Sequence, residues 1–363
     1  MLDLFVACAP GLEPLLVREL TDLGMAELRS EPGGVSVRAK PPAVSTICLH
    51  SGLANHLRLR VGVPFEVRHF DKLVKKTAAL PWNELLRPGT RVQVSAVCRK
   101  SRLYHSAGVA QRVEAGITKA IGEPRDGTPE VGVAVRIVRD TCTISLDLAG
   151  EPLHRRGWRQ QTAKAPLRED LARALLLVSG WAADRPLFDP MMGSGTVIIE
   201  AATMARRLAP GLSRRFAFEH TKLEIHADLE DQREAARAMV LPRTPVPIVG
   251  RDHMQGALDA AMGNAERAGV AGDLTLLRAA LEEPWPDLPS ASVVTNPPYG
   301  IRVGHVAEVH GLYAELGRQA TERGWPLTVI VADRRFVRSA GGGLEPKLTT
   351  DHGGIKITMY RSR

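Results

Sequence analysis

The spacing of hydrophobic residues changes twice along the chain and divides it into three zones. In residues 1–62, a short apolar run is followed by leucines at helical spacing, among them Leu12, Leu16 and Leu20. The segment 33–39, GGVSVRA, comes after a glycine turn and reads as a strand. We therefore expect residues 1–62 to form a small α+β unit.

The second zone, residues 63–150, predicts another α+β unit. The segments 91–98, 131–138 and 141–150 have the pattern of strands. A helical pattern occupies residues 109–122 between the first two strands and ends at a glycine. Residues 151–170 then form a polar and basic connector.

In the third zone, residues 171–363, strand and helix patterns take turns. Strands are expected at 185–190, 246–252, 274–279, 292–300 and 326–333, and helices at 171–181, 196–208, 257–269 and 309–324. This alternation predicts an α/β fold with an open, mostly parallel, doubly wound sheet. Ligands bind such sheets outside the carboxyl ends of the strands, near the point where the strand order reverses.

The bulk composition is that of a soluble globular protein. Of 363 residues, 44% are hydrophobic and 24% are charged, and no 18-residue apolar stretch occurs. The N-terminus has no basic region ahead of its apolar residues, which argues against a signal peptide. Four scattered cysteines without a C-x-x-C pair argue against both a disulfide framework and a zinc site. We expect a cytoplasmic monomer without a bound metal.

Positive charge is concentrated in one segment. The chain carries a net charge of +8, and residues 51–120 alone carry 13 lysines and arginines against 4 aspartates and glutamates. Such an excess is typical of a protein that binds a polyanion, although a solvated lysine-rich face would look the same. Basic residues with an aromatic ring and an imidazole suit phosphate contact and base stacking. The candidates are Lys75, Lys76, Arg99, Lys100, Arg102, Tyr104, His105 and Arg112, with Arg155, Arg156 and Arg159 in the connector. For Tyr104 and His105, a structural turn is an equally good interpretation.

The most informative motif is Asn296-Pro297-Pro298-Tyr299, at the end of the apolar run ASVVT. Amide and carbonyl oxygens can accept the N–H bonds of a planar amine, and the tyrosine ring can stack on its face. The alternative is a purely structural role, as a Pro-Pro turn after a strand. The motif therefore predicts a site for an amine acceptor.

A glycine loop follows an earlier strand in LFDPMMGSGTVIIEAA. Gly193 and Gly195 allow the backbone to approach a ligand, and Ser194 or Thr196 can cap the following helix. A Walker loop would need a lysine, and a dinucleotide fingerprint would need glycine where Ile198 stands. A methyl-donor loop is the third interpretation.

The strand IVGRD places Asp252 at its tip, where an acidic residue can accept hydrogen bonds from ribose hydroxyls. The alternative role for Asp252 is that of an N-cap. The glycine loop, this acidic tip and the Asn-Pro-Pro-Tyr motif follow the first, second and fourth strands of the predicted sheet. Their order makes the combination specific.

With these motifs, the sequence resembles the amino-methylating class I S-adenosylmethionine (SAM)-dependent methyltransferases. More closely, it resembles the bacterial RNA guanine-N2 methyltransferases that carry an N-terminal THUMP domain. The matching stretches are DPMMGSGTVIIEAA, APGLSRRFAFEH, GNAERAGV and VVTNPPYG, together with APGLEPLL, KSRLYHS, LHRRGWR and APLRED outside the catalytic domain. The resemblance covers nearly the whole chain.

The resemblance implies a ferredoxin-like domain over 1–62, a THUMP domain over 63–150, and a Rossmann-like catalytic domain over 171–363. It implies that SAM is held by Asp189, Pro190, Gly193, Ser194, Gly195 and Thr196, with Pro166 closing over it and Asp252 on the ribose. The motif Asn296, Pro297, Pro298 and Tyr299 would be catalytic. Three positions depart from the family pattern: Met192 replaces a small residue, Ile301 a frequent glutamate, and Ala280 an acidic residue near the adenine amine, where Glu282 or the backbone would substitute.

The predicted reaction is methylation of guanine N2 in structured RNA. The chain ends where one catalytic domain would be complete, whereas relatives acting on 23S rRNA often carry a second one, so the acceptor stem of tRNA is the expected substrate. Methylation of 23S rRNA is the alternative. A DNA adenine-N6 methyltransferase and a non-catalytic RNA-binding protein are the remaining candidates.

Overall fold

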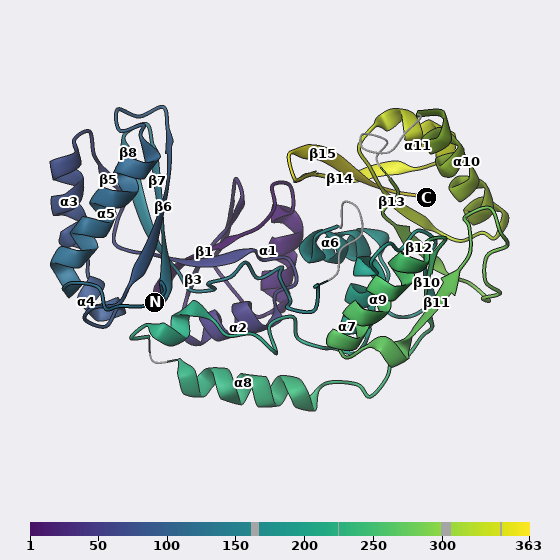
Figure 1. Ribbon diagram of the computed structural model, residues 1–363, viewed down its shortest axis with the longest axis horizontal. Coiled ribbons are helices and arrows are strands. Elements are labelled where there is room, and N and C mark those ends of the chain that lie inside the picture. The colour runs from purple at the N-terminus through teal and green to yellow at the C-terminus, as the bar shows by residue number, and fades with distance from the viewer. Residues whose placement is uncertain (161–166, 224, 299–305, 342) are drawn as a thin grey trace. The chain divides into compact units, whose positions relative to one another are not determined.

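The computed structural model describes residues 1–160, 167–223, 225–298, 306–341 and 343–363 (Figure 1). It divides the chain into two compact units. The first unit comprises residues 1–8, 17–153 and 214–233, and the second comprises 9–16, 154–213 and 234–363.

The first unit is built on an eight-stranded sheet in the order β2-β3-β1-β4-β8-β7-β6, with β5 paired to β8. Strands β6 and β7 run parallel, and the other neighbours run antiparallel. The strands are β1 Leu2–Ala7, β2 Leu28–Glu31, β3 Gly34–Ala39, β4 His56–Arg60, β5 Phe65–Glu66, β6 Val92–Arg99, β7 Val131–Val138 and β8 Thr141–Asp147. The first and second zones of the sequence share this sheet, because β4 pairs with β8.

The helices of the N-terminal half are α1 Glu13–Asp22, α2 Pro42–His50, α3 Phe70–Ala78, α4 Trp82–Leu85 and α5 Ser106–Ile121. A 3-10 helix, η1 Ala217–His220, and helix α8, His226–Ala238, follow much later in the chain. Figure 1 shows α3 and α5 packed alongside strands β5 to β8.

Helix α5 and strand β7 follow directly from the sequence pattern. Alternate residues of β7 are buried, and α5 buries Val109, Val113 and Ile117 at helical spacing. Gly122, with φ +86°, ends α5 as predicted. The helix begins at Ser106, three residues before the predicted start, because the His105 side chain accepts a hydrogen bond from the Gly108 N–H at 3.0 Å.

The second unit contains a seven-stranded sheet in the order β11-β10-β9-β12-β13-β15-β14. The first five strands are parallel, whereas β15 runs antiparallel to β13 and pairs with β14 as a hairpin. Its elements are α6 Glu169–Ser179, β9 Leu187–Asp189, α7 Thr196–Ala205, β10 Ile248–Asp252, α9 Gln255–Arg267, η2 Ala271–Asp273, β11 Leu274–Arg278, β12 Ser292–Thr295, α10 Val306–Glu322, β13 Leu327–Val331, α11 Arg334–Ala340, β14 Glu345–His352 and β15 Ile355–Arg361. The predicted mostly parallel α/β sheet is confirmed.

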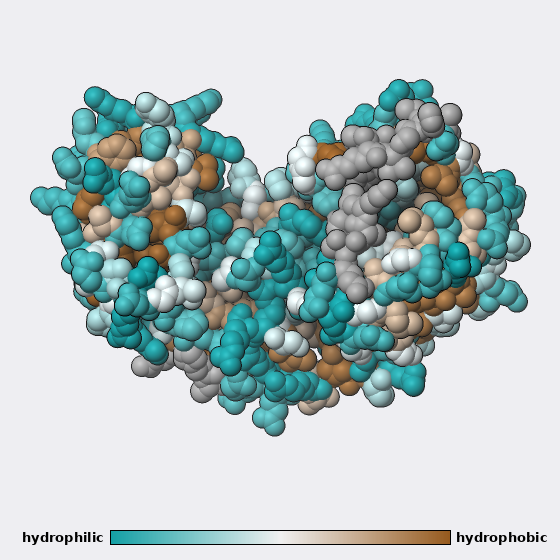
Figure 2. Space-filling model, viewed as in Figure 1, coloured by the Kyte–Doolittle hydropathy of each residue, from teal (hydrophilic) through white to brown (hydrophobic). Residues whose placement is uncertain are grey.

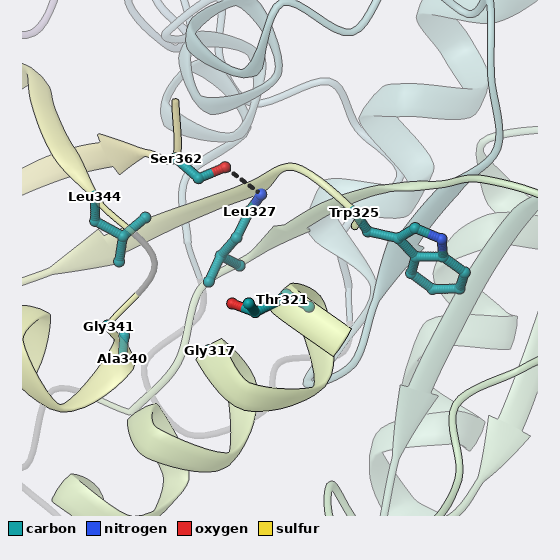
Figure 3. A pocket seen from close by; sticks show the side chains of 9 residues that line it. Gly317, Thr321, Trp325, Leu327, Ala340, Gly341, Leu344 and Ser362 are labelled. Atoms are coloured by element: carbon teal, nitrogen blue, oxygen red, sulfur yellow. Dashed lines mark hydrogen bonds between the residues drawn. The ribbon is translucent and has the colours of Figure 1, made fainter. Parts of the chain in front are cut away.

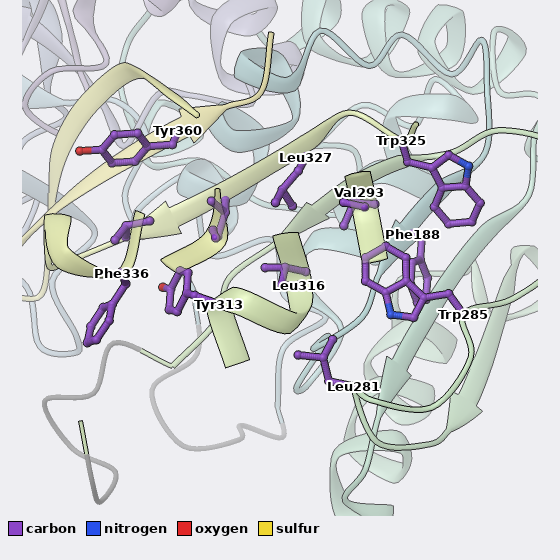
Figure 4. Close-up of a cluster of buried hydrophobic side chains, with 14 of the residues drawn as sticks. Phe188, Leu281, Trp285, Val293, Tyr313, Leu316, Trp325, Leu327, Phe336 and Tyr360 are labelled. Atoms are coloured by element: carbon purple, nitrogen blue, oxygen red, sulfur yellow. The ribbon is translucent and has the colours of Figure 1, made fainter. Parts of the chain in front are cut away.

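Helices cover both faces of this sheet. On one face, α10 and α11 bury an aromatic cluster around Phe188, Trp285 and Trp325 (Figure 4). The opposite face is covered by α7, since the missing Cβ of Gly250 on β10 points at Ile198 of that helix. Successive strand residues point to opposite faces, which explains why Val249 belongs to the aromatic cluster and Gly250 does not.

Candidate active site

The candidate site lies where the strand order reverses. Strand β9 has β10 on one side and β12 on the other, and β9 and β12 end at Asp189 and Thr295. The glycine loop follows Asp189, and Asn296 follows Thr295. The two motifs therefore start side by side at the carboxyl edge of the sheet, as the sequence predicts.

A hydrogen bond joins the last residues of the two strands that precede these motifs. The hydroxyl of Thr295 donates to Asp189 Oδ1 at 2.6 Å, and the Met191 N–H donates to the same oxygen at 3.1 Å. Burial raises the pKa of Asp189 to about 7, and the nearby charge of Asp252 adds to this increase, while the two hydrogen bonds oppose it. Asp189 thus holds the base of the loop. Its predicted contact with the donor stays a prediction.

The loop itself needs its glycines. Gly193 and Gly195 have φ of +52° and +82°, and a Cβ on Gly195 would lie 3.0 Å from the Cβ of Ala261. The expectation that Ser194 or Thr196 caps α7 is wrong, because Gly195 occupies the N-cap position and no side chain there accepts a hydrogen bond.

Asp252 fastens the loop to the tip of β10. Its Oδ2 accepts a hydrogen bond from the Gly193 N–H at 3.1 Å, and its Oδ1 accepts one from the Met254 N–H at 3.0 Å. The alternative role of Asp252 as the N-cap of α9 is wrong, because Met254 occupies the N-cap position and no side chain there accepts a capping hydrogen bond. The side chain remains 13% exposed, so its carboxylate can still accept a hydrogen bond from a ligand.

The position of Ala280 is set by a buried arginine. Arg251 donates to the carbonyl oxygens of Ala280, Glu283 and Pro284 at 3.2, 3.0 and 2.6 Å. The Ala280 N–H in turn donates to Glu283 Oε1 at 2.7 Å. Of the two neighbouring acidic residues, Glu283 therefore approaches Ala280, whereas the sequence suggested Glu282.

The Asn-Pro-Pro-Tyr motif follows directly after the last residue of β12, Thr295. Asn296 and Pro298 are half-buried and Pro297 is buried. Tyr299, Ile301 and Pro166 lie outside the described residues. The catalytic and cofactor roles of the motif residues, Pro190 included, remain predictions.

Most of the predicted RNA-binding side chains are exposed. These are Lys75, Arg99, Lys100, Arg102, Tyr104, His105, Arg112 and Arg155. Tyr104 is 79% exposed, which leaves its ring accessible for stacking. Lys76 is half-buried, with Nζ 5.0 Å from the Phe65 ring centroid.

Arg156 and Arg159 differ from the others. Arg156 is 8% exposed, and its Nε lies 3.5 Å from Glu200. Arg159 pairs with Glu169 at 3.2 Å and donates to Thr196 Oγ1 at 3.2 Å. Their guanidinium groups are used inside the second unit, which argues against the predicted RNA contacts.

The pocket in Figure 3, lined by Gly317, Thr321, Leu327 and Ser362, lies beside the amino end of β13, at the edge opposite to Asn296.

Within the described ranges, no helix is long and apolar enough to cross a membrane. Figure 2 shows hydrophilic residues over most of the visible face.

Three residues that support the motifs carry no signal in the hydrophobic pattern: Thr295, Arg251 and Asn264. The Asn264 side chain is completely buried and contacts the glycine loop. In the sequence, Asn264 is indicated only by its place in GNAERAGV, one of the stretches that resemble the methyltransferase family. Nothing in that stretch marks it as a buried polar residue.

The strand order, the glycine loop and the acidic tip together define a class I methyltransferase. The chain belongs to the family of RMKL-like methyltransferase domains, whose model matches residues 156–359. The RlmL ferredoxin-like domain matches residues 3–57, and the THUMP domain matches residues 67–147.

Three known proteins illustrate the relationship. The chain is 35% identical to the ribosomal RNA large subunit methyltransferase K/L of Syntrophotalea carbinolica, over 93% of this chain and 50% of that protein. It thus spans about half the length of the curated relatives it matches. A structure described as a methyltransferase in complex with S-adenosylhomocysteine (SAH) has a TM-score of 0.92 at 26% identity, covering 99% of this chain and 97% of the other. A predicted N6-adenine-specific DNA methylase from Listeria monocytogenes has a TM-score of 0.90 at 28% identity, covering 100% and 96%.

SAM is the cofactor of this family, and the described residues fit it. Within the described part of the chain, the Ser194 N–H has no hydrogen-bond acceptor, so it is available to the carboxylate of a ligand. Asp252 offers a partly exposed carboxylate for hydroxyl groups, and the loop glycines leave room for close approach.

Proposed function

We propose that this protein is a SAM-dependent methyltransferase that forms N2-methylguanosine in ribosomal RNA of the large subunit. The observation that carries the proposal is the adjacency of two motifs at the point where the strand order reverses. The glycine loop follows β9, and Asn296-Pro297-Pro298 follows the neighbouring β12.

In this proposal, the chain acts mainly by positioning. The Asn296 side-chain oxygen and the Pro297 carbonyl would accept the two N–H groups of the guanine amine, which favours a localised lone pair. SAM, when bound, supplies a methyl group on a sulfonium centre. The held amine can then displace the sulfur in line, and its proton can leave afterwards, so no strong general base is required. Tyr299 would stack on the extruded base.

RNA is the proposed substrate because of the N-terminal half of the chain. Residues 67–147 match the THUMP domain, and the exposed basic side chains lie around Tyr104 in the same region. Ribosomal RNA replaces the tRNA of the sequence-based expectation, since the matched curated relatives are named for large-subunit rRNA. A cytoplasmic location follows from this substrate.

The test is methyl transfer from labelled SAM to 23S rRNA by the wild type and the Asn296→Ala variant. Loss of one positioning contact at the acceptor is expected to lower kcat about 100-fold. Asn83→Ala is the matched control, because Asn83 is an exposed asparagine of the first unit, and it is expected to retain full activity. Undiminished transfer by Asn296→Ala would refute the assignment.

DNA adenine-N6 methylation is the second candidate. It is favoured by the name of the Listeria structure, and the same motif could hold an adenine amine. Parallel reactions with double-stranded DNA separate the two candidates, and we expect no methylation of DNA.

A further inference from the structure

We propose that Asn264 is a positioning residue of the donor site, whose side-chain amide fixes the glycine loop through the carbonyl of Ser194. This proposal rests on the proposed use of the loop for SAM. It adds a residue of α9 whose position in the sequence lies outside both the glycine loop and the Asn-Pro-Pro-Tyr motif.

The contacts of Asn264 define the orientation of its amide. Its Nδ2 donates to the Ser194 carbonyl oxygen at 3.1 Å, and its Oδ1 accepts from Arg267 Nη2 at 2.5 Å. The Gln160 N–H lies 3.4 Å from the same oxygen. Only the NH2 group can donate to a carbonyl and only the oxygen can accept from a guanidinium, so chemistry assigns the two atoms. The side chain is 0% exposed, and water cannot replace these bonds.

The Ser194 carbonyl and the Gly195 N–H belong to one peptide group. The Gly195 N–H donates to the Met192 carbonyl at 2.9 Å, and Asn264 holds the other side of the same peptide. This peptide is therefore held at both polar groups. Because the preceding Ser194 N–H is available to a ligand, holding this peptide also fixes the direction of that donor.

Arg267 connects this contact to the segment that leads out of the first unit. Its Nε donates to the Trp158 carbonyl at 2.8 Å, and Trp158 is buried. Among the described residues, Asn264 thus has two separable roles: donation to the loop, and acceptance from the Gln160 N–H and from Arg267, which holds the connector.

The Asn264→Asp variant separates them. Aspartate is isosteric and accepts from Arg267 at least as well, but it has no donor for the Ser194 carbonyl and places two acceptors against each other. We expect the Kd of SAH, measured by calorimetry on the full chain, to rise at least 10-fold. The KM for SAM should rise with it, whereas the affinity for RNA should stay within twofold.

Arg267→Met is the matched variant, since it removes the hydrogen bonds of the arginine to Asn264 and to Trp158 and leaves the donation to Ser194 in place. We expect it to weaken SAH binding less than Asn264→Asp does. The thermal shift induced by SAH provides a second measurement that registers only folded protein.

Two results would overturn the proposal. One is Asn264→Asp binding SAH within twofold of the wild type. The other is an equal or larger loss in Arg267→Met, which would mean that Asn264 acts only through the connector. Failure of the wild type to bind SAM or SAH would instead refute the proposed function itself.

Discussion

At the end of β9, the carboxyl group of Asp189 is 1% exposed and accepts two hydrogen bonds on one oxygen. Burial raises its pKa to about 7 from the ordinary aspartate value of 3.8. Between these two values the folded protein binds a proton that the unfolded chain does not hold. Stability is therefore lost as the pH rises through this window.

We predict that Asp189→Asn removes this pH dependence. The asparagine oxygen can accept both hydrogen bonds, because Thr295 and Met191 donate to the same Oδ1. The variant should gain stability relative to the wild type as the pH rises from 5 to 8, by at most about 1.4 kcal/mol per unit. Midpoints of urea unfolding at several pH values measure this difference. A difference that does not change with pH would contradict the assigned burial effect.

Part of the candidate site could be predicted from the sequence, whereas contacts between residues that are distant in the sequence could not. Gly193, Gly195 and Asp252 could be located because their chemistry is written in short motifs. The partners Asp189 and Thr295 lie 106 positions apart, and Asn264 and Ser194 lie 70 apart. Only the pairing of β9 with β12 and the packing of α9 bring them together.

At the scale of elements, the glycine loop packs against strand β10. The resemblance implies a small residue where this chain has Met192, which is buried over Gly250. A Cβ on Gly250 would lie 2.4 Å from Met192 Sδ and 2.6 Å from Ile198 Cδ1. The larger residue in the loop is thus accommodated by a glycine in the strand.

We predict that Gly250→Ala destabilises the protein by about 1–3 kcal/mol, because it overpacks this contact. Met192→Ala introduced with it should relieve part of the loss, giving a favourable coupling of about 1 kcal/mol in a double-mutant cycle. Urea unfolding of the wild type, the two single variants and the double variant measures the coupling. Additive effects would show that Met192 is not the residue against which β10 is packed.

The strongly patterned elements were predicted, whereas others were missed. Strands β6, β7, β10 and β13 and helices α7 and α9 match segments with clear periodicity. The β14–β15 hairpin was not predicted, although Gly353 and Gly354 mark its turn. Its first strand, EPKLTTDH, is largely polar because it is the edge strand of the sheet, and it therefore lacks the apolar signal used for the interior strands.

At the scale of the whole molecule, the net charge of residues 51–120 is the main sequence feature that points to RNA. Arg99, Lys100 and Arg102 are exposed at and after the end of β6, next to the exposed Tyr104. The segment that matches the ferredoxin-like domain also has three exposed cationic side chains, those of Arg18, Arg38 and Lys40. Each set contains three exposed cationic side chains, but the two sets lie in different domains. The ferredoxin-like set can therefore serve as a matched control.

We predict that replacing Arg99, Lys100 and Arg102 with glutamine weakens RNA binding and flattens its salt dependence. The slope of log K against log salt should fall by about 2 to 3 if each side chain neutralises one phosphate. Glutamines at Arg18, Arg38 and Lys40 should leave the slope unchanged. Filter binding across a salt series checks both triples, and an unchanged slope in the first would remove this surface from RNA recognition.

We propose that the Asn-Pro-Pro motif presents a guanine amine of ribosomal RNA to the methyl donor. Nucleoside analysis by mass spectrometry, after reaction of 23S rRNA with the wild type and with Asn296→Ala, tests it most directly. We expect N2-methylguanosine with the wild type and its loss with the variant. N6-methyladenosine as the product, or N2-methylguanosine formed equally by both proteins, would contradict it.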